Sequence, residues 1–261
     1  MLHFSANISL LFTEAPLLER LQRAKQCGFN AVELQFPYDV PADSLRDQLE
    51  AQQLRLVLFN VAADDLLQAG EGLAAVPEKK QAFQSALAQA VSYAKVLKPA
   101  AINVLPGRCL NPERYAEYLQ TFKDNIALAL AAFTPLGIKT VFEAINTHDM
   151  PGFIIHRQQQ MLDILAALQH PALFMQYDIY HMQRMQENSI SFIQQHAAKI
   201  GHIQFADNPG RGQPGTGTID FQAVFKAIAN STYDGWVGAE YKPVGTTQDS
   251  LAWFAEHTKT R

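Results

Sequence analysis

The sequence predicts an α/β fold in which eight parallel strands, each followed by a helix, close into one barrel. Strand-like and helix-like segments alternate eight times along the 261 residues, and right-handed crossovers of that number favour a closed barrel. No change of composition marks a linker, so residues 1–261 are expected to form a single domain. Four consecutive strand-like segments also end on a polar side chain, and a parallel barrel gathers such ends at one mouth. An open doubly wound sheet is the alternative, but no G-x-G-x-x-G motif follows the first strand.

The first half of the chain is predicted to contain four strands, at residues 3–9, 31–36, 54–60 and 101–105. Helices are expected over 15–27, over 41–52, from Pro77 onward and from Pro112 to about 133, where apolar residues recur at helical spacing. Pro16 suits the first turn of the first helix, and Gly28 suits the position just past its end. Residues 61–76 form a long irregular connection, and connections of this length are often binding loops or lids.

The second half is predicted to contain four more strands, which begin at residues 140, 173, 200 and 236. Helices are expected over 157–169, 189–198, 221–228 and 247–257, and Asp220 is expected to cap the third of these. Residues 207–218 are rich in glycine and proline and are expected to form a loop.

Each strand of the second half ends on a side chain that carries an oxygen donor. These residues are Glu143, Asp178, Gln204 and Glu240. Any one of them alone is more simply a solvated strand end or a helix cap. Four of them at matching ends of consecutive strands favour a common site for a divalent metal ion. Carboxylate and amide oxygens without cysteine suit a hard ion such as Mg²⁺ or Mn²⁺.

Four further side chains are candidates for binding a substrate. His181, three residues after Asp178 on the loop that leaves the sixth strand, can donate to a substrate oxygen, and a structural loop histidine is the alternative. Arg108 and Arg211 lie on loops at the same mouth and are candidates for bidentate contact with a substrate carboxylate. Lys242 follows Glu240 by two residues and is a candidate to hold an anionic group or to pair with a ligand acid.

Three other polar residues are expected near this mouth. His202 shares the inward face of its strand with Gln204 and lies deeper, where a core histidine with satisfied hydrogen bonds is the expectation. Asn7 and Asn60 end the first and third strands and are candidates to line the pocket.

Composition excludes several classes of protein. A formal charge of −4 gives no basic surface for nucleic acid, and two cysteines without paired spacing suggest neither a disulfide framework nor a zinc knuckle. The N-terminus lacks the pattern of a signal peptide, and no apolar run is long enough to cross a membrane, so we expect a soluble cytoplasmic protein. No G-x-S-x-G, P-loop or H-E-x-x-H motif occurs, which leaves metal-assisted chemistry on a small polar molecule.

Two segments carry a resemblance to a known family. Y-D-I-Y-H-M-Q from Tyr177 and G-H-I-Q-F-A-D-N-P-G-R-G-Q-P-G-T-G from Gly201 resemble hydroxypyruvate isomerases, which belong to the xylose-isomerase-like superfamily of barrels. The likeness runs from the opening F-S-A-N-I-S, through F-P-Y-D and E-A-I-N, to G-A-E-Y-K-P from Gly238, and so spans nearly the whole chain. Phe205 and Thr218 depart from the commonest residues of the signature without altering an expected role.

The resemblance implies a site and a reaction. It implies metal ligands at Glu143, Asp178, Gln204 and Glu240, with proton donor and acceptor roles for the two glutamates. The implied activity is the interconversion of hydroxypyruvate and tartronate semialdehyde by metal-assisted proton transfer through an enediolate. The expected cofactor is Mg²⁺ or Mn²⁺, and the expected partner is a small 2-oxo acid rather than nucleic acid or membrane.

Alternatives remain at the level of the substrate and of the reaction class. A 2-oxo-tetronate isomerase shares the barrel and the ligands, although its loop at residues 207–217 looks different, and a ketose 3-epimerase would need a wider mouth. A metal-dependent endonuclease of the related DNA-repair barrel would want more histidine ligands and a basic face. A non-catalytic sugar or acid sensor would not need the two glutamates. The sequence leaves the oligomeric state open, a homo-oligomer included.

Overall fold

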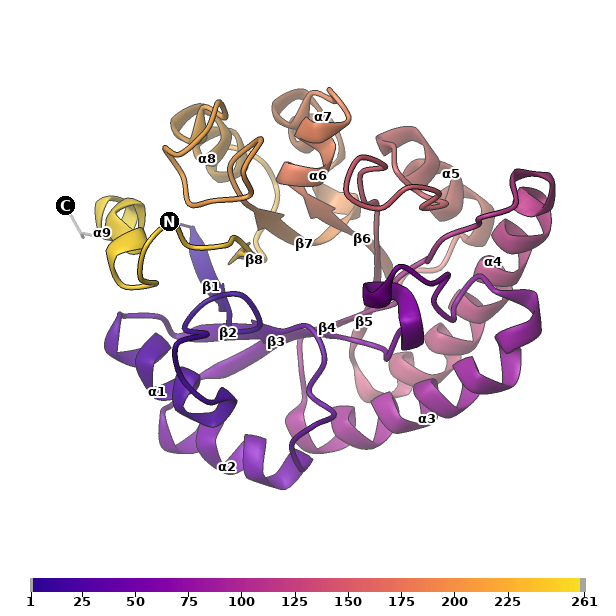
Figure 1. Ribbon diagram of the computed structural model, residues 1–261, viewed down its shortest axis with the longest axis horizontal. Helices are drawn as coiled ribbons and strands as arrows, with labels where there is room; N and C mark the ends of the chain where they lie inside the picture. The colour runs from indigo at the N-terminus through magenta and orange to yellow at the C-terminus, as the bar shows by residue number, and fades with distance from the viewer. Residues whose placement is uncertain (1, 259–261) are drawn as a thin grey trace.

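The computed structural model describes residues 2–258, and in this part of the chain eight parallel strands form a closed barrel (Figure 1). The strands are β1 (His3–Asn7), β2 (Ala31–Leu34), β3 (Arg55–Asn60), β4 (Ala101–Asn103), β5 (Lys139–Glu143), β6 (Leu173–Asp178), β7 (Ile200–Phe205) and β8 (Trp236–Ala239). Each strand pairs in parallel with the next, and β8 pairs with β1. The closed barrel confirms the predicted fold and excludes an open doubly wound sheet.

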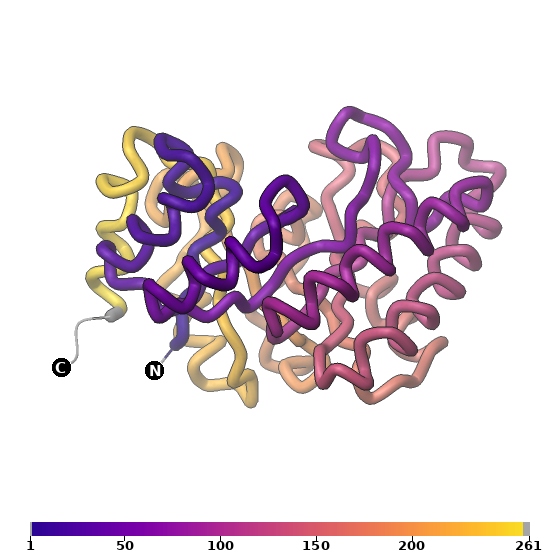
Figure 2. Tube along the Cα trace, turned by 90° about the horizontal axis from the view of Figure 1, so that it is seen from below, coloured from indigo at the N-terminus to yellow at the C-terminus, as the bar shows by residue number. Residues whose placement is uncertain are grey.

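Helices surround the barrel on its outer side (Figure 1). They are α1 (Leu17–Gln26), α2 (Ala42–Ala51), α3 (Lys80–Leu97), α4 (Tyr115–Phe133), α5 (Gln158–Leu168), α6 (Ile179–Arg184), α7 (Ser189–His196), α8 (Phe221–Ala229) and α9 (Ala252–Thr258). The two ends of the described chain lie side by side, because β1 pairs with β8 and α9 packs beside them (Figure 2). Within residues 2–258, no helix combines the length and the apolar character that a membrane span requires.

Local signals in the sequence account for most helix ends. Gly28 follows α1 with a φ of +96°, a conformation that glycine adopts without steric cost. The Asp220 carboxylate accepts a hydrogen bond from the Ala223 N–H and caps α8, as predicted. Predicted and observed ends of the other elements differ by a few residues, which is the usual uncertainty of such boundaries.

The segment after β6 differs from the prediction. His181 was expected on a loop, but it lies in the short helix α6. Asp178 is the N-cap residue of this helix, because its Oδ1 accepts hydrogen bonds from the backbone N–H groups of Tyr180 (2.7 Å) and His181 (3.4 Å). A helix of six residues is too short for its apolar spacing to stand out in the sequence.

The inside of the barrel is filled in layers that change from apolar to polar. The lower layer contains Ala31, Val57, Ala101 and Val141, with Phe174 and Trp236 packed against them. Two residues further along the same strands, on the same face, lie polar side chains such as Glu33, Asn103 and Glu143. The apolar layer thus supports a buried polar layer at the carboxyl ends of the strands.

Gly238 of β8 leaves the space that one of these polar groups needs. A Cβ atom at this position would lie 2.1 Å from Oε2 of Glu33, well inside van der Waals contact. The Glu33 carboxylate cannot move aside without cost, because Ser5, Asn7, His202 and Gln204 all donate hydrogen bonds to it. A glycine is therefore required where β8 passes this buried acid.

We predict that Gly238→Ala destabilises the protein by about 2 kcal/mol or more, since overpacking here must also break hydrogen bonds to a buried carboxylate. Denaturant-induced unfolding measures the change. Gly210→Ala is the matched control, because an added Cβ at Gly210 meets no atom within 4 Å. Equal unfolding midpoints for Gly238→Ala and the wild-type chain would contradict the prediction.

Candidate active site

The side chains predicted to gather at the mouth of the barrel do so. Glu143 is the last residue of β5, Asp178 is the last of β6, Gln204 lies one residue before the end of β7, and Glu240 directly follows β8. All four are at least 96% buried. The negative charge of Glu240 lies close enough to raise the pKa of both Glu143 and Asp178. Residues nearly a hundred positions apart in the sequence therefore form one buried acidic site.

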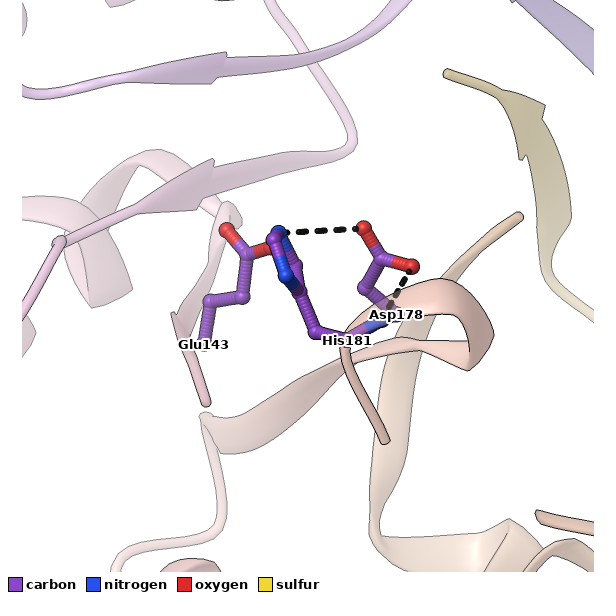
Figure 3. Close-up of side chains that lie close together, drawn as sticks. All are labelled: Glu143, Asp178 and His181. Carbon is purple, nitrogen blue, oxygen red and sulfur yellow. Dashed lines mark hydrogen bonds and ion pairs between the residues drawn. The ribbon is translucent and has the colours of Figure 1, made fainter. Parts of the chain in front are cut away.

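Glu143, Asp178 and His181 form a group that can hold a metal ion when Nε2 of His181 carries no hydrogen (Figure 3). One donor atom from each residue lies within 4.8 Å of the others. The His181 Nε2 atom is 3.8 Å from Oε1 of Glu143 and 3.6 Å from Oδ2 of Asp178. Among the described residues, this Asp178 oxygen is buried and has no hydrogen-bond partner. An unpartnered buried carboxylate oxygen fits a cation, because burying it alone carries a large desolvation cost.

The hydrogen bonds of His181 determine which of its ring nitrogens carries the proton. The Asn146 Oδ1 atom accepts from the backbone N–H groups of His148 and Asp149, so the Asn146 amide presents its NH₂ group to Nδ1 of His181 at 2.7 Å. Nδ1 therefore accepts, and in the neutral ring Nε2 carries the hydrogen. Burial first, and the nearby charge of Arg211 second, lower the pKa of His181 well below its usual value. His181 thus points a neutral N–H at the two carboxylates.

Gln176 connects Glu143 with Gln204. Its Nε2 donates to Oε2 of Glu143 (2.9 Å) and to Oε1 of Gln204 (2.6 Å). Asn103 donates to the same Glu143 oxygen at 3.3 Å. One oxygen of Glu143 is thereby held by amides, while the other faces His181.

Glu240 is held by three donors, one of which is a predicted substrate-binding residue. Its Oε1 accepts from Asn7 (2.9 Å) and Gln35 (3.0 Å), and its Oε2 accepts from the guanidinium of Arg211 (2.8 Å). The Arg211 guanidinium also lies 5.2 Å from the centre of the Tyr180 ring. Its Nε is buried and has no partner within the described part of the chain. Arg211 therefore lies inside the site with one donor unused.

The other two predicted cations lie differently. Arg108 donates to the backbone carbonyl oxygens of Pro151 (2.6 Å) and Ala69, and so ties together the connections that follow β3 and β5. The side chain of Lys242 is exposed. Both lie outside the acidic group, and their contact with a substrate stays a prediction. Asn60 is buried, as expected for a residue that lines the mouth.

Glu33 and Gln176 are buried polar residues of this site that the sequence interpretation missed. Glu33 lies in the middle of β2, and its Oε2 atom is 2.6 Å from Nε2 of His202, which confirms the expected core histidine with a satisfied hydrogen bond. Both residues lie within their strands and do not end them. An acid or an amide inside an otherwise apolar strand is the signal that would have found both residues.

Burial and repulsion between neighbouring negative charges raise the pKa of the carboxylates of the site. Desolvation, and then the charge of Glu240, raises the pKa of Asp178 to about 7. The same two causes raise the pKa of Glu143 well above its usual value. Desolvation and the charge of Glu33 raise the pKa of Glu240, although Arg211 opposes this effect. Acids of this kind can exchange protons near neutral pH.

The comparisons with known proteins agree with this geometry. The family model described as xylose isomerase-like TIM barrel matches residues 21–257. The chain belongs to the xylose isomerase-like TIM barrel family. It is 41% identical to the hydroxypyruvate isomerase of Escherichia coli K12 over 97% of this chain and 98% of that protein. It is 34% identical to the 2-oxo-tetronate isomerase of Pectobacterium atrosepticum over 96% of this chain and 95% of that protein.

Two solved structures share the fold over nearly its whole length. A structure titled AP endonuclease, family 2, from Brucella melitensis superposes with a TM-score of 0.94 at 33% identity, and covers 98% of this chain and 99% of that one. A 3-keto-D-glucoside 4-epimerase from E. coli superposes with a TM-score of 0.80 at 17% identity, covering 98% and 100%. Together with the curated relatives, the family identifies the chain as an enzyme with an isomerase function.

We predict that the metal-free protein loses stability as the pH rises from 6.5 to 8.5. The folded-state pKa of Asp178 is raised to about 7 from 3.8, and that of Glu143 is raised well above its usual value, so the folded chain binds more protons than the unfolded chain in this range. The free energy of unfolding then falls by up to about 1.4 kcal/mol per proton and pH unit, which lowers the melting temperature by roughly 3–6 °C per pH unit for a chain of this size.

Calorimetric melting in the presence of a chelator measures this change. Asp178→Asn is the informative variant, because the amide keeps an oxygen for capping α6 but removes the charge. It should melt at a higher temperature than the wild type at pH 8.5 and show a smaller pH dependence. A wild-type melting temperature that rises between these pH values would contradict the assignment.

Proposed function

We propose that the enzyme interconverts hydroxypyruvate and tartronate semialdehyde. The observation that carries this proposal is the pair of buried glutamates, Glu143 and Glu240, which belong to one site and both have a raised pKa. An isomerisation that moves a proton between adjacent carbons needs acids of this kind. The proposal also draws on the relative in E. coli whose name states this activity.

We infer a site for Mg²⁺ or Mn²⁺ made of Glu143, Asp178, Gln204 and Glu240. The donors are oxygen atoms, which suit a hard ion, and the unpartnered Oδ2 of Asp178 is the observation that fits a cation. His181 is left out of the ligand set because its Nε2 carries a hydrogen and has no lone pair to offer. A divalent ion held there would supply positive charge that stabilises negative charge on the carbonyl and hydroxyl oxygens of the substrate.

The chain's own residues then move the proton. One glutamate takes a proton from C3 of hydroxypyruvate, and the electron pair of that C–H bond forms the C2–C3 double bond of an enediolate. The hydroxyl proton passes from the oxygen on C3 to the oxygen on C2, and a glutamate returns a proton to C2. No atoms or electrons are gained or lost, so no redox cofactor is needed. The raised pKa values of Glu143 and Glu240 suit groups that accept and return protons near neutral pH.

Arg211 and His181 are proposed to orient the substrate. The unused Nε of Arg211 can donate to the substrate carboxylate, and planar guanidinium groups suit this contact. The neutral N–H of His181 can donate to the oxygen that becomes negative during proton transfer, where an aligned donor is worth the most.

A 2-oxo-tetronate isomerase is the second candidate, because relatives with that name match the chain over nearly their whole length. Its substrate has one more carbon, and a difference of that size changes selectivity by only about 1–3 kcal/mol. A ketose 3-epimerase would act with the same acids on a longer molecule. A metal-dependent endonuclease is disfavoured by the net charge of −4, since strong binding to phosphates needs basic groups.

The test is a coupled assay with hydroxypyruvate, 2-oxo-tetronate and free ketoses, each with and without a chelator. We predict the highest kcat/KM for hydroxypyruvate and a loss of turnover in chelator that Mg²⁺ or Mn²⁺ restores. Faster turnover of 2-oxo-tetronate would replace the proposed substrate. Full activity in chelator would remove the metal ion from the mechanism.

We predict that Glu143→Gln and Glu240→Gln each lower kcat by at least about 10²-fold, because an amide cannot accept the transferred proton. Circular dichroism should show an unchanged fold for both variants. Glu117→Gln, which alters an exposed carboxylate on α4, is the control and should keep full activity. Normal turnover by either active-site variant would refute its acid–base role.

A further inference from the structure

A completely buried carboxylate contacts Gln204, one of the candidate metal ligands, and has no part in the proposed chemistry. Glu33 has no exposed surface, and four side chains donate to it. Ser5 (3.1 Å) and His202 (2.6 Å) contact its Oε2, whereas Asn7 (3.0 Å) and Gln204 (2.7 Å) contact its Oε1. Because Gly238 leaves the space for this group, the barrel is built to contain it. A buried carboxylate with four hydrogen-bond donors fixes the orientation of the side chains around it.

The direction of these hydrogen bonds fixes the orientation of Gln204. A carboxylate that accepts donors on both oxygens has no hydrogen to give, so the amide of Gln204 must turn its NH₂ group towards Glu33. The amide oxygen of Gln204 then faces the opposite way. There it accepts from Gln176, whose NH₂ group also donates to Glu143. The orientation of one amide is thereby passed to the next and ends at a glutamate of the proposed site.

A second bridge runs from Glu33 to the other glutamate. The NH₂ group of Asn7 donates to Oε1 of Glu33 at 3.0 Å and to Oε1 of Glu240 at 2.9 Å. Glu33 therefore reaches Glu240 through Asn7, and it reaches Glu143 through Gln204 and Gln176. In both bridges every amide donates towards a carboxylate. If Glu33 became a neutral group with a donor of its own, it would no longer enforce the orientation of Gln204. Asn7, in contrast, would still be oriented by the Ser9 N–H, which donates to its Oδ1 at 3.0 Å.

We propose that Glu33 is a positioning residue that presents the oxygen of Gln204, rather than its nitrogen, to the metal ion and holds Glu143 and Glu240 in register through directed amide bridges. This inference rests on the proposed function, because it needs Gln204 to be a metal ligand. In this inference the buried polar layer of the barrel orients metal ligands in addition to filling the interior. Partners that orient metal ligands in this way typically change metal affinity by roughly 10–100-fold when they are removed.

An exchange of the two groups tests the inference. Glu33→Gln replaces one of the two acceptor oxygens by an NH₂ group, so an acceptor no longer has to face Gln204, and Mn²⁺ binding should weaken by up to roughly 10–100-fold, as measured by titration calorimetry. Gln204→Glu alone places a second carboxylate against Glu33 at the 2.7 Å contact, and so should lower the melting temperature. In the double variant Glu33→Gln/Gln204→Glu, the amide at position 33 donates to the carboxylate at position 204. An oxygen atom at position 204 therefore again faces the metal ion. The double variant should recover the wild-type melting temperature within a few degrees and the wild-type Mn²⁺ affinity within about threefold.

Glu14→Gln is the matched control, because it removes a carboxylate that accepts hydrogen bonds from Thr247 and takes no part in the bridges. It should bind Mn²⁺ as the wild type does. If Glu33 has a purely structural role, the losses of melting temperature and of Mn²⁺ affinity in the two single variants should add in the double variant. If Glu33 orients Gln204, the double variant should recover both quantities. Should Glu33→Gln be too unstable to titrate, rescue of folding and of Mn²⁺ binding in the double variant still supports the inference.

The outcomes also separate this inference from the proposed function. Wild-type affinity in Glu33→Gln, or a double variant no better than the sum of its parts, would overturn the role of Glu33 and leave the metal site standing. A wild-type chain that binds no Mn²⁺ would overturn the metal site and the role of Glu33 together, while the isomerase assay without added metal would still report on Glu143 and Glu240.

Discussion

The structure depends on one electrostatic constraint, which is the enclosure of several carboxylates at a single end of a closed barrel. Parallel closure brings the carboxyl ends of β5 to β8 together, so Glu143, Asp178 and Glu240 must share a space with little water. Burial and mutual repulsion raise the pKa of each. We propose that the same proximity that destabilises the metal-free protein gives the site its affinity for a cation and its capacity to exchange protons. Stability and function are therefore opposed at this site.

The barrel limits this cost by surrounding the acids with directed donors. Arg211 contributes a positive charge against Glu240, and amides of Asn7, Gln35 and Gln176 contribute hydrogen bonds. Such contacts are stronger inside a protein than in water, because the surroundings screen them less. Oδ2 of Asp178 is a fully buried carboxylate oxygen that accepts no hydrogen bond in the described part of the chain. Most carboxylate oxygens of the site thus have hydrogen-bond donors without an ion. An ion bound at Oδ2 of Asp178 would offset the cost of burying that oxygen.

The sequence was sufficient for the fold and for the residues at strand ends, because both follow from patterns along the chain. Apolar segments that stop at an acid predicted where Glu143, Asp178 and Glu240 meet. The buried residues Glu33 and Gln176 were missed because their partners come from other strands, and only closure of the barrel brings these together. The helix that carries His181 was missed because a capping aspartate, and not apolar spacing, begins it. The two arginines were indistinguishable in the sequence, and only the path of their loops separates Arg211 from Arg108.

A crystal structure of the protein with Mn²⁺, analysed by anomalous scattering, tests the central claim most directly. The account predicts a single strong anomalous peak at the mouth of the barrel, coordinated by oxygens of Glu143, Asp178, Gln204 and Glu240. His181 should lie beside the ion without binding it, and its Nδ1 should still accept from Asn146. A peak bound to the ring nitrogen of His181, or the absence of a peak between the glutamates at saturating Mn²⁺, would contradict the account.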